Sequence, residues 1–120
     1  MEESSYREIY KQKLNEDESY EQESVNRLEA SVYAFLSKLR NRNPKAHLLW
    51  VYGMMGTGLS IYLEETIARY KNDTGDQNVS YQLLPDTLPE WLGARMHPGI
   101  PSHHATAEIL TAAIQNILKN

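Results

Sequence analysis

The sequence contains no cysteine, so neither a disulfide framework nor a cysteine-ligated metal centre can form. It also lacks a long hydrophobic run, because the apolar stretch at residues 48–52 falls far short of the ~18 residues that a membrane span requires. Basic residues are outnumbered, with 12 Lys and Arg against 16 Asp and Glu and a net charge of −4. This balance argues against a nucleic-acid partner, which would select a strongly basic surface.

The first residues also lack the pattern of an export signal. Met1 is followed by Glu2 and Glu3, whereas a signal peptide begins with a basic region and continues with an apolar one. For the chain as written we therefore expect a cytoplasmic location and no membrane partner. This expectation does not extend to a longer parent protein.

What is present fits one globular domain preceded by an acidic segment. The hydrophobic fraction of 41% and the charged fraction of 23% lie in the ordinary range. Residues 1–24 hold eight acidic and three basic residues, whereas residues 25–120 hold eight and nine. We therefore predict an acidic arm or helix over 1–24 and an α/β domain over 25–120. Helical spacing within the arm is shown by Tyr6, Ile9, Tyr10 and Leu14.

Apolar residues at steps of three and four predict three helices in the domain. The first extends from Val25 to the stop signal at Asn43 and Pro44, and the second follows Leu59 and ends near Gly75. The third begins at about His103. Its predicted inner face consists of Ala107, Leu110, Ile114, Ile117 and Leu118.

Two further segments have the patterns of strands. Residues 48–54 are continuously apolar, which predicts a central strand buried on both faces of a parallel sheet. In residues 79–84, Val79, Tyr81 and Leu83 alternate with polar residues, which predicts a half-exposed strand at a sheet edge. The alternation of helices and strands indicates an α/β fold. Because two strands are a marginal basis for a domain, we expect them to belong to a larger sheet, completed by a homo-oligomer or by a missing N-terminal half.

A glycine turn follows the first strand and has the spacing of a phosphate loop. Gly53 to Ser60 matches GxxxxGK[ST] except that Leu59 occupies the position of the lysine. Without that cation the phosphates lose their main neutralising charge, and the glycines have a sufficient explanation in backbone geometry. We expect no nucleotide and no other cofactor.

Three histidines near the C-terminus raise the question of a metal site. His97, His103 and His104 form no HExxH motif, and two adjacent histidines cannot both face one ion from a regular helix. We therefore expect no metal.

The same region carries a family resemblance. The block Ala94-Arg-Met-His97-Pro98-Gly-Ile-Pro-Ser-His103-His-Ala-Thr-Ala107-Glu-Ile-Leu110 resembles the C-terminal block of GDSL/SGNH hydrolases, in the branch of acetyl-xylan and related carbohydrate esterases. The preceding helix and strand segments, at 33–40, 43–46 and 49–55, resemble the same family in the same order. The resemblance covers residues 25–118. It implies a partial flavodoxin-like, three-layer fold with two parallel strands and three to four helices.

The resemblance also implies roles for individual residues. His97 corresponds to the catalytic general base and acid of an ester hydrolase, next to Pro98, and His103 corresponds to a structural residue that braces the last helix. Ala94 stands where most of the family has an aspartate that orients the catalytic histidine. The esterase branch often uses a Ser–His pair oriented by a backbone carbonyl, and Asp86 or Glu90 are the alternative carboxylates for that role.

The sequence departs from the family further upstream. It has no Gly-Asp-Ser block for the nucleophile and no Gly and Asn blocks for the oxyanion hole. We therefore expect this chain to be the C-terminal half of a carbohydrate esterase or lipase-like hydrolase, inactive alone and directed to an acylated carbohydrate. The alternative is a non-catalytic, oligomeric α/β module derived from such an enzyme, in which His97 is an unused loop residue.

Overall fold

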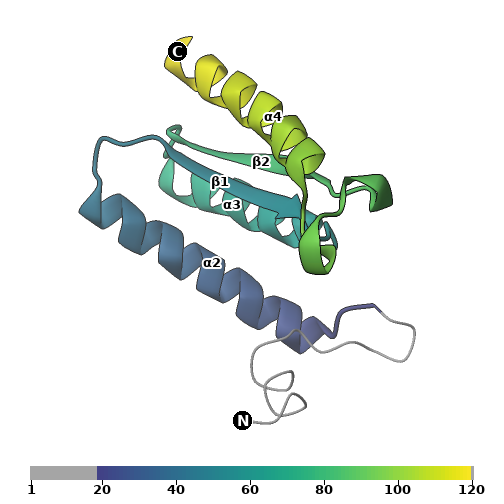
Figure 1. Ribbon diagram of the computed structural model, residues 1–120. Helices are drawn as coiled ribbons and strands as arrows, with labels where there is room; N and C mark the ends of the chain where they lie inside the picture. Colours follow the sequence, from purple (N-terminus) through teal and green to yellow (C-terminus); the bar gives the residue numbers. More distant parts are fainter. Residues whose placement is uncertain (1–18, 120) are drawn as a thin grey trace.

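The computed structural model describes residues 19–119 of the chain. Its elements follow the order helix, strand, helix, strand, loop, helix (Figure 1). They are α2 (Gln22–Arg42), β1 (Leu48–Met54), α3 (Ser60–Thr74), β2 (Val79–Asp86), the 3-10 helices η1 (Pro89–Trp91) and η2 (Ala94–Met96), and α4 (Ile100–Lys119).

The two strands form a parallel sheet between layers of helices. Leu48 of β1 is paired with Val79 of β2, and the register continues to Tyr52 and Leu83. Figure 1 shows α2 and α3 on one side of the sheet and α4 on the other. The predicted α/β fold with two parallel strands is therefore confirmed, and each of the three predicted helices exists.

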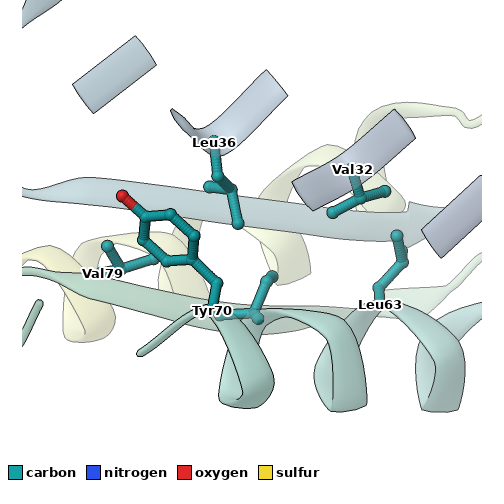
Figure 2. Close-up of a cluster of buried hydrophobic side chains, with 6 residues drawn as sticks. Val32, Leu36, Leu63, Tyr70 and Val79 are labelled. Atoms are coloured by element: carbon teal, nitrogen blue, oxygen red, sulfur yellow. The ribbon is translucent and has the colours of Figure 1, made fainter. Parts of the chain in front are cut away.

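The core lies between the sheet and the layer formed by α2 and α3 (Figure 2). Apolar side chains at helical spacing on both helices meet one face of the strands, where complete burial of such a side chain contributes about 1.5–3 kcal/mol. The buried members of this cluster are Val32, Leu36, Leu63, Ile67, Tyr70 and Val79. Leu48, Trp50, Tyr52 and Tyr81 pack against them from the strands.

A local irregularity ends the regular pairing of the strands. The register shifts between Tyr52 and Met54, and the intervening Gly53 has a φ of 145°. A side chain at this position would collide with the backbone carbonyl of Leu84. Gly53 is thus required both for its backbone conformation and for the close approach of the two strands.

A half-buried guanidinium group joins the chain segments at the amino ends of the strands. Arg40, in the last turn of α2, forms an ion pair with Asp76, with 2.7 Å between Nε and Oδ2. The same guanidinium donates hydrogen bonds to the backbone carbonyls of Asn43, Ala46 and Asn78. One side chain therefore fixes the end of α2, the turn into β1 and the turn into β2.

Several predicted boundaries require correction. α2 begins at Gln22, three residues before the predicted start of this helix at Val25. α4 begins at Ile100, three residues before the predicted start at His103. The expected helical spacing of Tyr6, Ile9, Tyr10 and Leu14 lies outside the described residues.

The predicted inner face of α4 was also wrong in part. The side chains buried against the rest of the structure are Ser102 and Thr106, whereas Ala107, Ile114 and Leu118 are exposed. Small polar residues permit a close approach to β2, and the apolar stripe lies elsewhere on the helix.

No helix within residues 19–119 is long and apolar enough to cross a membrane.

The strands differ from the expectation in burial. In β2, Leu83 was expected on the same buried face as Val79 and Tyr81, but Leu83 is exposed and its neighbour Leu84 is buried. β1 is not buried on both faces: its residues are half-buried, apart from Val51, which is exposed. The reason is that β1 pairs with β2 along one edge only within the described residues.

Replacement of Arg40 tests its role in stability. Arg40→Ala should lower the free energy of unfolding by about 3 kcal/mol, because it removes the ion-pair partner of the Asp76 carboxylate and one hydrogen bond from each of three backbone carbonyls. Lys38→Ala, at an exposed position of the same helix, should change it by no more than about 0.5 kcal/mol. Urea unfolding measures both variants, and equal effects would contradict the assigned role.

The same ion pair predicts acid sensitivity. Burial raises the pKa of Asp76, but hydrogen bonds from Arg40, the Asn78 amide and Tyr70 outweigh it and hold the pKa below its ordinary value. A lowered folded-state pKa stabilises the fold above the unfolded-state pKa of ~3.9, and this contribution is lost as the pH falls through the folded-state value. The stability difference between the wild type and Asp76→Asn should therefore shrink below about pH 4. A difference that stays constant from pH 7 to pH 3 would disprove the linkage.

Candidate active site

The candidate site lies where both parallel strands end. The backbone N–H of Thr87, just after β2, donates a hydrogen bond of 3.0 Å to the carbonyl of Met54 at the end of β1. The loop that follows β2 therefore starts across the carboxyl ends of both strands. In open α/β sheets, ligands bind beyond the carboxyl ends of the strands.

Asp86 connects the glycine turn to this loop. Its Oδ1 atom accepts hydrogen bonds from the backbone N–H of Gly56, at 3.0 Å, and from that of Thr87, at 2.9 Å. The carboxylate thus accepts the hydrogen bond of a backbone N–H of the glycine turn. In a phosphate loop this N–H would have to bind the phosphate. This contact gives the turn a structural purpose and adds to the argument against a phosphate loop.

Two tyrosine hydroxyls from the strands fix the start of α3. The Tyr52 hydroxyl accepts a hydrogen bond from the Leu59 amide at 3.2 Å, and the Tyr81 hydroxyl lies 2.7 Å from the Ser60 hydroxyl. The glycine turn is consequently held at both of its ends. The tyrosines were recognised in the sequence only as apolar residues of the strands.

A hydroxyl pair anchors the far end of the loop. Thr87 Oγ1 lies 2.7 Å from the Oγ atom of Ser102, which is fully buried in the first turn of α4. This bond holds the start of α4 against the end of β2 and thereby sets the span of the intervening loop. Neither contact is predictable from the sequence, because an isolated Ser or Thr carries no pattern.

The segment with His97 folds back on the residues before it. Leu92 and Pro98 form an antiparallel bridge, and the Gly93 amide donates to the carbonyl of His97 at 2.7 Å. Between them, Arg95 and Met96 adopt positive φ angles of 56° and 61°. Left-handed conformations cost non-glycine residues roughly 1–2 kcal/mol each, so the hydrogen bonds of this hairpin must hold a strained backbone.

The imidazole of His97 projects from this strained hairpin into solvent. It is exposed, and it forms no hydrogen bond with any of the residues 19–119. The two alternative carboxylates do not orient it: Asp86 holds backbone amides, and Glu90 is exposed without a hydrogen bond to the ring. An accessible imidazole can accept a proton and return it, but its partners for that reaction are not provided by this part of the chain.

The other histidines do not join His97. His103 lies in the first turn of α4 with an exposed side chain, and only its backbone amide is bonded, to the Gly99 carbonyl. Within the described residues, the Ser102 hydroxyl is the group that ties the start of α4 to the loop, and the bracing role that the resemblance implies for His103 stays a prediction. No three metal-ligating side chains lie together in the described part of the chain.

One serine does contact a histidine, but at the amino ends of the strands. His47 Nε2 lies 2.7 Å from Ser80 Oγ, immediately before β1 and near the start of β2. This pair joins the two strands at their amino ends, whereas the loop with His97 lies at their carboxyl ends. We interpret it as a structural cross-strand contact.

Comparison with solved structures finds carbohydrate esterases among the similar proteins. An acetyl xylan esterase from the rumen bacterium Butyrivibrio proteoclasticus is 37% identical, with a TM-score of 0.85 over 92% of this chain. A family two carbohydrate esterase from Clostridium thermocellum, solved in complex with cellohexaose, is 31% identical, with a TM-score of 0.70 over 79% of this chain. The chain is related to carbohydrate esterases. The resemblance stated from the sequence is thereby confirmed at the level of this relationship.

The relationship concerns only part of the esterases. The chain spans 29% of the length of the Butyrivibrio protein and 31% of that of the Clostridium protein. A scan against protein-family models finds no match, and a search of the curated proteins finds none either.

The hairpin that carries His97 can be tested through its glycines. A Cβ atom at Gly99 would lie 2.6 Å from the carbonyl oxygen of Trp91, whereas one at Gly93 would lie 3.2 Å from the Gly99 Cα atom. Gly99→Ala should therefore lower the free energy of unfolding by about 1–3 kcal/mol and shift the NMR signals of the His97 ring. Gly93→Ala should have the smaller effect on both, and the reverse order would contradict this geometry.

Proposed function

We propose that this chain is the histidine-bearing part of an SGNH-type ester hydrolase that removes acyl groups from carbohydrates, with His97 as the general base and acid. The observation that carries the proposal is the relationship to an acetyl xylan esterase at 37% identity over 92% of the chain. The position of His97 supports it, because an accessible imidazole on a hydrogen-bonded hairpin beyond the carboxyl ends of the strands suits proton transfer.

In the proposed reaction, His97 takes the proton of a serine hydroxyl as the serine oxygen attacks the ester carbonyl. It then gives this proton to the alcohol oxygen of the sugar as the carbon–oxygen bond breaks, which leaves an acyl-enzyme for water to hydrolyse. The serine and the oxyanion donors would come from the part of the related esterases that has no counterpart in this chain. Docking of that part would also have to supply the group that orients the His97 ring.

A second candidate is a non-catalytic, homo-oligomeric α/β module derived from such an esterase. It is favoured by the edge of β1 that has no partner strand within residues 19–119, because such an edge is a template for strand pairing with another chain. On this hypothesis His97 has no reacting partner, and the strained hairpin at Arg95 and Met96 serves only the fold.

A chimaeric enzyme tests the proposed reaction. This chain would replace the segment of the Butyrivibrio esterase with which it aligns, and release of acetate from acetylated xylan would be measured. The chimaera should be active, and His97→Ala should lower kcat about 10³-fold with an unchanged melting temperature, because proton transfer is lost and the fold is not.

His103→Ala and His104→Ala are the matched controls, because both imidazoles are exposed in the first turn of α4 and neither has a role in the proposed reaction. The chain by itself should hydrolyse aryl acetates no faster than its own His97→Ala variant. A folded but inactive chimaera would instead support the second candidate.

A further inference from the structure

Strained backbone is concentrated at the carboxyl ends of the strands. Among residues 19–119, the non-glycine residues with a positive φ are Met54, Arg95 and Met96. Met54 is the last residue of β1, and the other two lie in the hairpin just before His97. Such conformations persist only where the surrounding structure holds them, and they are most frequent at functional sites.

Arg95 is an unusual residue for its position in this hairpin. Its φ of 56° and ψ of 31° define the left-handed conformation, which glycine and asparagine adopt most easily. Glycine already occupies positions 93 and 99 of the same hairpin. Because glycine at position 95 would relieve the strain, the backbone alone does not explain why an arginine is there.

The contacts of Arg95 do not explain it either. The residue is exposed, and it forms no ion pair and no hydrogen bond with any described residue. By contrast, Arg27 and Arg40 are each paired with a carboxylate. Of the carboxylates in the same loop region, Asp86 binds backbone amides and Glu90 forms no ion pair with Arg95. The guanidinium of Arg95 is therefore available to a ligand.

We propose that Arg95 determines substrate specificity by binding a carboxylate of the carbohydrate, so that acyl groups close to a uronic acid are removed preferentially. The proposal rests on the proposed function for the carbohydrate, and on the hairpin for the cation. A guanidinium presents two parallel N–H donors that match the two oxygens of a carboxylate. Uronic acids are the sugars that carry this group.

The hairpin keeps the cation close to His97. Two residues of chain separate them, so their Cα atoms lie within about 7 Å of each other. The bridge between Leu92 and Pro98 and the hydrogen bond from the Gly93 amide to the His97 carbonyl enclose both in one closed turn. With an ester bond placed beside His97, the long side chain of Arg95 can reach the sugar that carries the ester or its neighbour.

Two substrates that differ only in the uronic acid test this role. Acetate release by the chimaeric enzyme would be measured on acetylated xylan that carries glucuronic acid, and on the same xylan after enzymatic removal of that sugar. The KM should be about three- to five-fold lower for the acidic substrate, because one exposed ion pair contributes modestly in water. The kcat should be the same for both, and added salt should reduce the preference.

Variants of the hairpin separate charge from backbone conformation. Arg95→Asn should abolish the preference without lowering the melting temperature, because asparagine tolerates the left-handed conformation and carries no charge. Arg95→Lys should retain part of the preference, since the charge remains and the paired donors are lost. Met96→Asn, which changes the adjacent strained residue but no charge, should leave the preference intact. Arg42→Gln should also leave it intact, because Arg42 is an exposed arginine at the other end of the strands.

A titration of the isolated chain gives a readout that does not require activity. The isotope-labelled 120-residue chain would be titrated with a xylo-oligosaccharide that carries glucuronic acid, and with the neutral oligosaccharide of the same length. The acidic sugar should shift the NMR signals of the amides at residues 94–97 at lower concentration than the neutral one. Arg95→Asn should remove this difference.

The outcomes distinguish this role from the proposed function. An active chimaera that shows no preference, or whose preference survives Arg95→Asn, would overturn the role of Arg95 and leave the proposed function intact. An inactive chimaera would disprove the proposed function, and the titration would then decide: equal shifts with both sugars, or none, would overturn the role. A melting temperature that falls with Arg95→Asn but not with Arg42→Gln would mean that a carboxylate of the protein binds Arg95, and would overturn it as well.

Discussion

The guanidinium of Arg40 holds three segments of the chain together at the amino ends of the strands. It binds Asp76 and three backbone carbonyls at the point where α2 ends and both strands begin. A small two-stranded sheet has little hydrogen bonding of its own, so the relative position of its strands must be fixed from outside. Arg40 does this at the amino ends, together with the contact between His47 and Ser80.

The carboxyl ends of the strands are fixed by a different set of contacts. Asp86 holds the glycine turn, and the hydroxyl pair of Thr87 and Ser102 holds the start of α4. The loop between these anchors has fixed ends, which allows its hairpin to retain the left-handed residues Arg95 and Met96. The contacts of Arg40 thus lie at the amino ends of the strands, and the loop with His97 lies at their carboxyl ends.

The sequence predicts the elements of this fold well because each has a strong period. The bounds expected for β1, residues 48–54, coincide with the observed strand, and the helices deviate by a few residues at their ends. The side of α4 that packs against the sheet could not be predicted in the same way. Its apolar stripe includes Ile114 and Leu118, but the contacts that fix the helix are those of Ser102, which have no periodic signal.

The site shows the same limit. His97 was identified through a family resemblance and not through periodicity, and no local pattern predicts that its hairpin is strained. Asp86 was considered as an orienting carboxylate, yet it binds the amide of Gly56, thirty residues away in the sequence. Such a contact depends on the parallel register of the strands, which sequence patterns alone do not define.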